Sequence, residues 1–196
     1  SGNHVIRRKI LKKIRVDTAY VLVRLVIGTL RILPRRAALG IGSMLGRIIP
    51  YTAPKELNTA VENLTRAFGS DRSDAEVKRL ARESFRMLAL NFVDTVRLRA
   101  MRHCDIIRLS IPHNFDRLTN AVKEGRGVII LASHAGSWEW SAGFIAIEGI
   151  PVSGVATKMY DPRLEKMLNE SREYMGIKVI SRGNNTRDII RALKKG

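Results

Sequence analysis

The chain has 196 residues, of which 45% are hydrophobic, with 15 glycines and 6 prolines. These values exclude a disordered or collagen-like chain and are typical of one packed domain with at most a small appendage. A single cysteine, Cys104, excludes an internal disulfide and a cysteine-based metal site. The 35 lysines and arginines against 18 acidic residues give a net charge of +17, which predicts an anionic partner.

Much of this charge lies at the start of the chain. Residues 1–36 contain ten basic residues and one acid, Asp17. Such a cluster attracts either nucleic acid or the anionic face of a membrane, or only aids solubility. Because nucleic-acid arms seldom precede a strongly apolar segment, and residues 18–33 are the most apolar in the chain, we expect a membrane surface and no nucleic acid as the partner.

The stretch 18–33 predicts a helix that is apolar around most of its girth. Its polar stripe carries Arg24 and Arg31 and continues to Arg35, and we expect these three arginines to contact lipid phosphates. Sixteen residues reach only about 24 Å, short of the roughly 30 Å hydrocarbon layer. The sequence therefore favours a helix in the membrane interface over one that spans it, and a buried helix of a soluble core is the alternative.

Three further helices are predicted before residue 100. Residues 37–51 contain glycines four and six apart, which suit a helix packed closely on another helix or lying shallowly in lipid. Pro54 can open a second helix. Ser73–Glu76 forms a capping box that starts a long amphipathic helix. The basic face of that helix is either solvated or a docking surface, and it would suit an acidic carrier protein.

From residue 114 onward, helices and short apolar strands alternate. This alternation predicts βαβ units, and therefore an α/β fold with a mainly parallel sheet flanked by helices, preceded by the basic helical region. Pro162 and Gly176 mark the start and stop of one helix. The expected strands are residues 127–133, 150–157 and 177–181, and the expected helices are residues 115–125, 138–149, 161–176 and 185–196.

The segment after the first expected strand reads Ser-His-Ala-Gly-Ser-Trp-Glu-Trp, residues 133–140. His134 and Glu139 could not meet on one continuous helix, because residues five apart lie about 140° from each other. They can meet if His134 ends the strand, Ala135 and Gly136 form a turn, and Ser137 caps the next helix. The alternative is a strand end with an acid that only compensates the helix dipole.

A histidine held by a carboxylate is a general base. No activated nucleophile lies near it in the sequence, since Cys104 is thirty residues away and the Gly-x-Ser-x-Gly elbow is missing. The base would therefore act directly on a substrate hydroxyl. The sequence has neither a phosphate-binding glycine loop nor a metal-ligand cluster, so we expect no resident cofactor and no metal.

At these residues the chain resembles the lipid A biosynthesis (lauroyl/myristoyl) acyltransferase family, within the wider lysophospholipid acyltransferase-like group. The likeness rests on the His-x4-Glu block at residues 134–139, on residues 61–88, which are similar to an Asn-Leu…Ala-Phe segment, and on Arg172 and Gly176, which match an Arg-x3-Gly element. The resemblance extends over nearly the whole chain.

The resemblance implies a fatty acyl transfer from an acyl-carrier-protein or acyl-CoA thioester to a hydroxyl of a lipid or glycolipid. His134 would be the base, Glu139 would orient it, and Arg172 would position substrate or stabilise the oxyanion. Substrate contacts are also expected at Ser137, Trp138 and Lys158.

The resemblance further places the protein on the cytoplasmic face of the inner membrane, peripheral or with a single N-terminal anchor. We expect residues 1–36 to form the membrane-associating helix and residues 37–196 the acyltransferase domain, which is C-terminally incomplete relative to the family. Two other functions stay open: a glycerol-phosphate-type acyltransferase, and a basic module that binds membrane or nucleic acid without chemistry.

Overall fold

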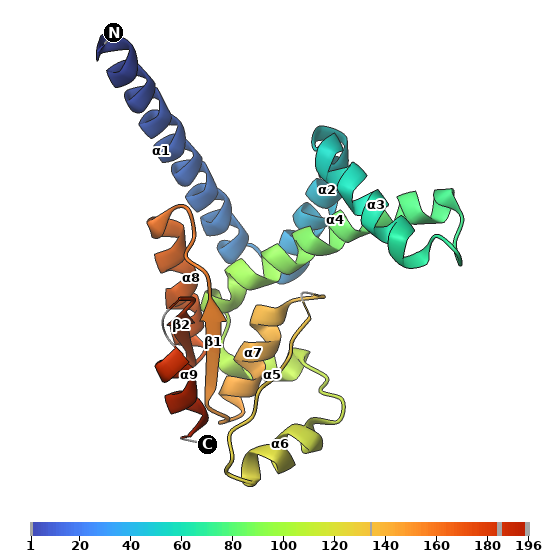
Figure 1. Cartoon of the computed structure of the whole chain (residues 1–196), viewed down its shortest axis with the longest axis vertical. Helices are drawn as coiled ribbons and strands as arrows, with labels where there is room; N and C mark the ends of the chain where they lie inside the picture. Colours follow the sequence, from blue (N-terminus) through green and yellow to red (C-terminus); the bar gives the residue numbers. More distant parts are fainter. Residues whose placement is uncertain (1, 134, 184–185, 195–196) are drawn as a thin grey trace.

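The computed structural model describes residues 2–133, 135–183 and 186–194. It is mostly helical (Figure 1). The elements are α1 (Gly2–Ile32), α2 (Arg35–Thr52), α3 (Pro54–Phe68), α4 (Asp74–Arg97), the short 3-10 turn η1 (Leu98–Ala100), α5 (His103–Leu109), α6 (Phe115–Lys123), α7 (Trp138–Ile147), β1 (Val152–Ala156), α8 (Pro162–Tyr174), β2 (Ile177–Ser181) and α9 (Thr186–Leu193).

The parallel sheet is smaller than the sequence predicts. In the described residues it has two strands, β1 and β2, in register from Val152 beside Ile177 to Ala156 beside Ser181. Helix α8 connects them, so this part is the expected βαβ unit. Local signals set its boundaries: Pro162 occupies the first turn of α8, and Gly176 ends it with a φ of 83°.

The strand predicted over residues 127–133 is corrected by the structure. This segment belongs to neither a helix nor a strand, and Ile129, Ile130 and Leu131 are exposed, Leu131 to 99%. An apolar run indicates that a segment tends to be buried, but a strand also needs the backbone of a neighbouring strand for its hydrogen bonds. In the described part of the chain the two paired strands are β1 and β2.

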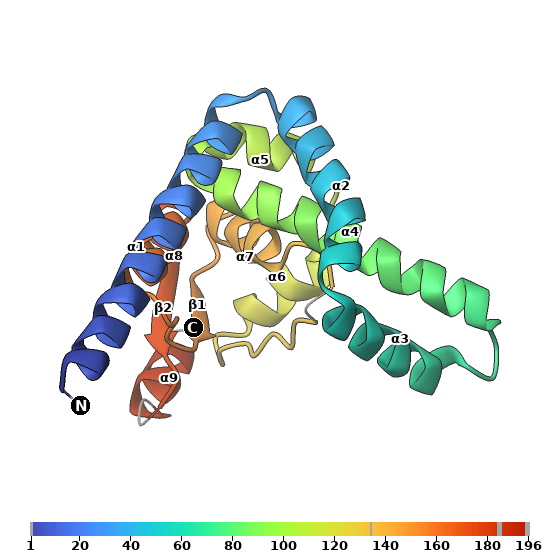
Figure 2. The same ribbon diagram turned by 90° about the horizontal axis from the view of Figure 1, so that it is seen from above.

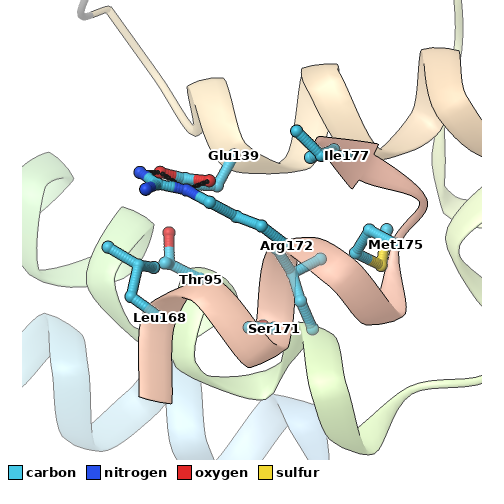
Figure 3. Close-up of a pocket in the computed structure, with 8 residues that line it drawn as sticks. Thr95, Glu139, Leu168, Ser171, Arg172, Met175 and Ile177 are labelled. Carbon is cyan, nitrogen blue, oxygen red and sulfur yellow. Dashed lines mark hydrogen bonds and ion pairs between the residues drawn. The ribbon is translucent and has the colours of Figure 1, made fainter. Parts of the chain in front are cut away.

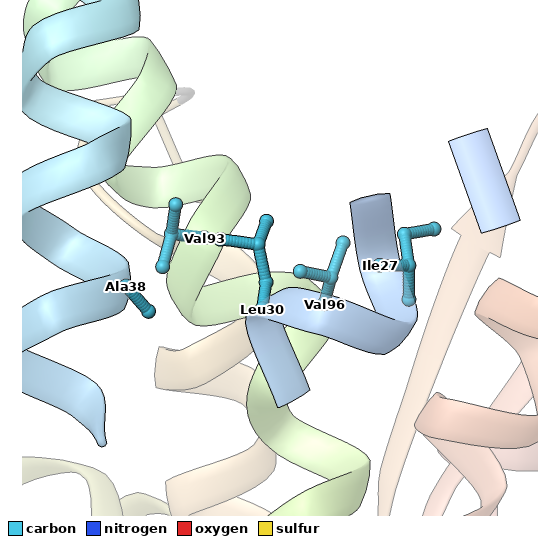
Figure 4. Close-up of a cluster of buried hydrophobic side chains, with 5 residues drawn as sticks. All are labelled: Ile27, Leu30, Ala38, Val93 and Val96. Atoms are coloured by element: carbon cyan, nitrogen blue, oxygen red, sulfur yellow. The ribbon is translucent and has the colours of Figure 1, made fainter. Parts of the chain in front are cut away.

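Helix α1 extends well before the apolar stretch 18–33, because it begins at Gly2 and includes the basic residues, which are good helix formers. Its C-terminal end packs on α4, and Figure 4 shows Ile27 and Leu30 against Val93 and Val96, with Ala38 of α2 beside them. Among the described residues, no helix combines the length and the apolar character that a membrane crossing requires. The domain division at residue 36 stays a prediction.

Arginines secure α1 to the rest of the protein. Arg97 of α4 is buried, and its Nη1 donates to the carbonyls of Leu30 and Leu33 (2.6 Å for Leu33) at the end of α1. Burial lowers the pKa of Arg97. Farther along α1, Arg163 of α8 pairs with Asp17 at 2.8 Å and lies over the Tyr20 ring.

Helix α2 lies against α4 through small residues. The buried face of α2 consists of Ala38, Gly42, Gly46 and Pro50. A Cβ atom on Gly46 would lie 2.6 Å from the Arg86 Cα and 2.9 Å from the Ala89 Cβ, whereas a Cβ on Gly40 would meet nothing within 4 Å. Close packing between helices was one of the two roles predicted for these glycines, and the structure confirms it at Gly46.

This contrast predicts opposite effects of the same substitution on one helix. We expect Gly46→Ala to reduce the free energy of unfolding by about 1–3 kcal/mol, because the new methyl group must push α2 away from the α4 backbone. Gly40→Ala should raise the same quantity by up to about 1 kcal/mol, because alanine is the better helix former. Denaturant unfolding of both variants in one detergent measures this difference, and equal effects would show that the α2–α4 contact tolerates the methyl group.

The long capped helix agrees with its prediction. Ser73 and Glu76 form both hydrogen bonds of the capping box, Ser73 Oγ accepting from Glu76 N–H and Glu76 Oε2 accepting from Ser73 N–H. The hydrogen bonds that the Ser73 N–H and the Ser73 hydroxyl donate to the Glu76 carboxylate lower the pKa of Glu76. Helix α4 then runs across the molecule beneath α1 and α2, which diverge from their connection like the arms of a V (Figure 2). Its C-terminal end reaches α7 and α8.

Candidate active site

Glu139 lies in the first turn of α7 and is 7% exposed. The chain reverses just before it at Gly136, whose φ of 74° favours glycine. Ser137 occupies the N-cap position as predicted, but its side chain makes no capping hydrogen bond. The amino end of a helix stabilises a carboxylate. A buried carboxylate in this position nevertheless needs a direct partner.

That partner is Arg172 of α8. Its Nε donates to both carboxylate oxygens of Glu139, at 3.2 Å to Oε1 and 3.0 Å to Oε2, and its Nη2 also contacts Oε1. Figure 3 shows the two side chains pointing toward one another between their helices. The remaining amino group, Nη1, donates to Asn169 Oδ1 at 3.3 Å. This is a bidentate, charge-assisted ion pair with restricted geometry.

A glycine lets the two helices come close enough for this pair. Gly143 lies one turn after Glu139 on the same face of α7, and a Cβ atom there would overlap the terminal methyl group of Met175. Met175, Ile177 and Leu98 form a buried cluster with Ile106 beside the ion pair. The apolar contact therefore sets the spacing at which Arg172 reaches Glu139.

The ion pair lies in a small pocket. Its lining comes from α4, η1, α7, α8 and β2, and consists of Thr95, Leu98, Glu139, Leu168, Ser171, Arg172, Met175 and Ile177. The Oγ atoms of Ser171 and of Ser137 are buried and, among the described residues, have no hydrogen-bond partner. Ser137 lies at the start of α7, and Ser171 lies on α8 in the lining of the pocket. In the described ranges no group of three His, Cys, Asp or Glu could hold a metal.

The position of the predicted base, His134, lies outside the described residues. Because residues 127–133 form no strand, the site is not at the carboxyl end of a paired strand as predicted. The structure instead brings together Glu139 and Arg172, which are 33 residues apart. Each carboxylate oxygen has two lone pairs, so Glu139 can accept an imidazole N–H in addition to the bonds from Arg172.

The chain matches the family described as bacterial lipid A biosynthesis acyltransferase over residues 7–196. It belongs to this family. Membership makes the protein an acyltransferase that acts on a lipid acceptor with an acyl donor. Among curated proteins, no match to the chain was found.

The other predicted contact residues of this acyltransferase lie in different surroundings. Ser137 and Trp138 are half-buried at the start of α7, next to Glu139, and Lys158 is exposed in the loop before α8. Asn169 and Ser171 were not predicted. Asn169 could have been found from its spacing, because it lies three residues before Arg172 on one helix and therefore faces the same way.

The arginines expected to contact lipid have protein contacts in the acyltransferase. Arg31 Nε donates to the Val96 carbonyl at 2.7 Å, and Arg24 lies near the Tyr20 ring. Arg35 pairs with both carboxylate oxygens of Asp94, at 3.0 and 2.7 Å. Their membrane role stays a prediction.

Arg35 also links α2 to the site. Its guanidinium lies over the ring of Trp140, 5.6 Å from the centroid, and Trp140 follows Glu139 in α7. The indole N–H donates to Ser110 Oγ at 2.9 Å. Both faces of the first turn of α7 are thereby held, one by Arg172 and the other by Arg35.

Proposed function

We propose that this acyltransferase moves a fatty acyl chain from the thioester of acyl carrier protein or CoA to a hydroxyl group of a lipid or glycolipid. His134 would remove the hydroxyl proton as the oxygen attacks the thioester carbonyl. The carbon–sulfur bond then breaks, and the thiolate takes the proton back from the imidazolium. The observation that carries this proposal is Glu139, buried five residues after His134 and fixed by Arg172.

Glu139 is the orienting group in this mechanism. A carboxylate that accepts the second ring N–H of a histidine fixes the tautomer and balances the charge of the imidazolium. Arg172 determines where that carboxylate lies, and its hydrogen bonds to Glu139 and Asn169 leave two of its five N–H groups for other partners. We therefore assign Arg172 as a positioning residue for Glu139 in addition to its expected contact with substrate.

The buried hydroxyl groups of Ser137 and Ser171 fit a second task. The tetrahedral intermediate carries its negative charge on the former carbonyl oxygen, and pre-positioned donors stabilise that charge most effectively in a site that excludes water. Ser137 lies between His134 and Glu139 in the chain, so of the two serines we expect its hydroxyl to lie nearer to the reacting carbonyl. This keeps Ser137 as a substrate-contacting residue, as the sequence predicts.

We further propose that the protein works at the cytoplasmic face of the inner membrane. The side of α1 opposite Ile27 and Leu30 is exposed and apolar, and the four exposed residues Arg7, Arg8, Lys13 and Arg15 lie toward its N-terminal end. An apolar face next to cations is typical of helices that lie in an anionic interface.

The proposal is tested with the purified chain and radiolabelled acyl donors. Acyl carrier protein and CoA thioesters of the same chain length are each offered with a glycolipid extract or with glycerol 3-phosphate and lysophospholipid. We expect label in the glycolipid fraction. Label in the glycerol-based lipids would favour the glycerol-phosphate-type reaction instead, and no transfer above the level of heat-inactivated protein would favour the non-catalytic membrane-binding module.

A further inference from the structure

Helix α2 has two different faces. Its small-residue face lies on α4, as described above. Its outer face carries Ile41, Met44, Leu45 and Ile48, each between 37% and 55% exposed. The spacing of these residues, with steps of three, one and three, places them in one sector about 100° wide. Nothing in the described residues covers this sector.

Helix α1 has an exposed apolar face of its own. Val21, Leu22, Leu25 and Val26 of α1 are about half exposed, on the side away from α4. Ile32, where α1 ends, is 86% exposed and lies between the two surfaces in the chain. Both helices lie on the same side of α4 in Figure 2. Two exposed apolar helix faces on one side of α4 mark an interaction site.

The charges around this face identify its occupant. Helix α2 contains no acidic residue, and Arg36 and Arg47 are exposed on it. Residues 1–36 contain ten basic residues, Arg36 among them, and one acid, Asp17, which is paired with Arg163. A second copy of the chain would bring like charges together, whereas an anionic lipid surface offers both opposite charge and apolar depth.

We propose that the outer face of α2 lies in the interfacial layer of an anionic membrane beside α1, so that two helices and not one hold the enzyme. This inference rests on the membrane association in the proposed function and adds a second contact to it. Because α2 packs directly on α4 and Arg35 reaches Trp140, membrane contact along α2 fixes the orientation of α7 toward the lipid. The hydroxyl group of a lipid acceptor in that membrane would then lie at a defined depth relative to α7.

Environment-sensitive labels test this arrangement in the full chain. The exposed Cys104 is first replaced by serine. Single cysteines are then introduced by Leu45→Cys on α2, Leu22→Cys on α1, and Asn120→Cys on α6, which lies far from both helices (Figure 1). Each is labelled with a fluorophore that brightens and shifts to the blue in lipid. With vesicles of phosphatidylglycerol and phosphatidylcholine, we expect a shift at residues 45 and 22 and none at 120.

The same labels distinguish failure of the α2 contact from failure of the membrane anchor. A shift at 22 without one at 45 overturns the α2 contact but keeps the membrane anchor of the proposed function. No shift at either overturns both. A shift at 45 without vesicles that grows with protein concentration identifies a second copy as the occupant and overturns the lipid assignment.

A neutral double substitution gives an independent measure. Leu45→Gln combined with Ile48→Gln should reduce partitioning into the same vesicles about tenfold or more, because each side chain loses its transfer into the apolar layer. The control Ile111→Gln changes an exposed isoleucine in the loop between α5 and α6 and should leave partitioning unchanged. Equal partitioning of both variants contradicts the proposal.

Discussion

Replacement of His134 by alanine should abolish measurable acyl transfer while folding and vesicle binding remain those of the parent chain. A general base contributes about 10²–10⁴-fold to the rate. Of the other three histidines, His103 has its own partner, since its Nε2 lies 3.1 Å from the Tyr174 carbonyl. We expect the loss in kcat, because the proton is removed only as the transition state forms.

The matched control is His113→Ala, which removes an exposed histidine from the loop before α6. Its transfer rate should equal that of the parent chain. The assay is radiolabelled acyl transfer to glycolipid, with unfolding curves recorded for both variants. Near-parent turnover by His134→Ala would mean that the segment 133–140 carries no base and that the proposed mechanism is wrong.

Replacement of Arg172 by alanine should damage both stability and catalysis. It leaves the Glu139 carboxylate buried without its ionic partner, and the removal of one member of a buried pair costs about 3–5 kcal/mol of unfolding free energy. If Arg172 acts by positioning Glu139, kcat falls more than KM rises. Exposed Arg117 on α6 gives the control, since Arg117→Ala should change neither.

A double variant separates the two effects. Glu139→Gln combined with Arg172→Met removes both charges, so we expect the double variant to be more stable than Arg172→Ala alone. Its activity should stay low, because a neutral amide cannot balance the imidazolium. If Arg172→Ala raises KM and leaves kcat unchanged, then Arg172 binds substrate directly and its bond to Glu139 is only structural.

Family membership narrows the reaction class more than geometry does. The match over residues 7–196 gives an acyltransferase with a lipid acceptor. The buried ion pair makes the proposed mechanism testable, because the mechanism assigns separate tasks to Glu139 and Arg172. In the sequence these two residues were singled out for different reasons, one as an orienting acid and one as a substrate contact.

Local chemistry in the sequence determined where α4 begins and where α8 begins and ends. The capping box at Ser73 and Glu76, the proline at 162 and the glycine at 176 all act within one turn, so they have the same effect in any tertiary setting. The strands β1 and β2 were predicted for a related reason, since short apolar segments between two helices are typical of βαβ units. The predicted α/β class therefore holds for this unit alone, because the described chain is mostly helical with a two-stranded parallel sheet.

Contacts between distant segments were decided only by the tertiary structure. Residues 127–133 have the apolar pattern of a buried strand but no paired neighbour, and a pattern cannot report whether another backbone lies beside it. Glu139 and Arg172 meet because Gly143 admits Met175 between α7 and α8. The exposed face of α2 likewise depends on which side packs on α4. Helix caps are local, whereas ion pairs and helix contacts depend on which surfaces the whole chain brings together.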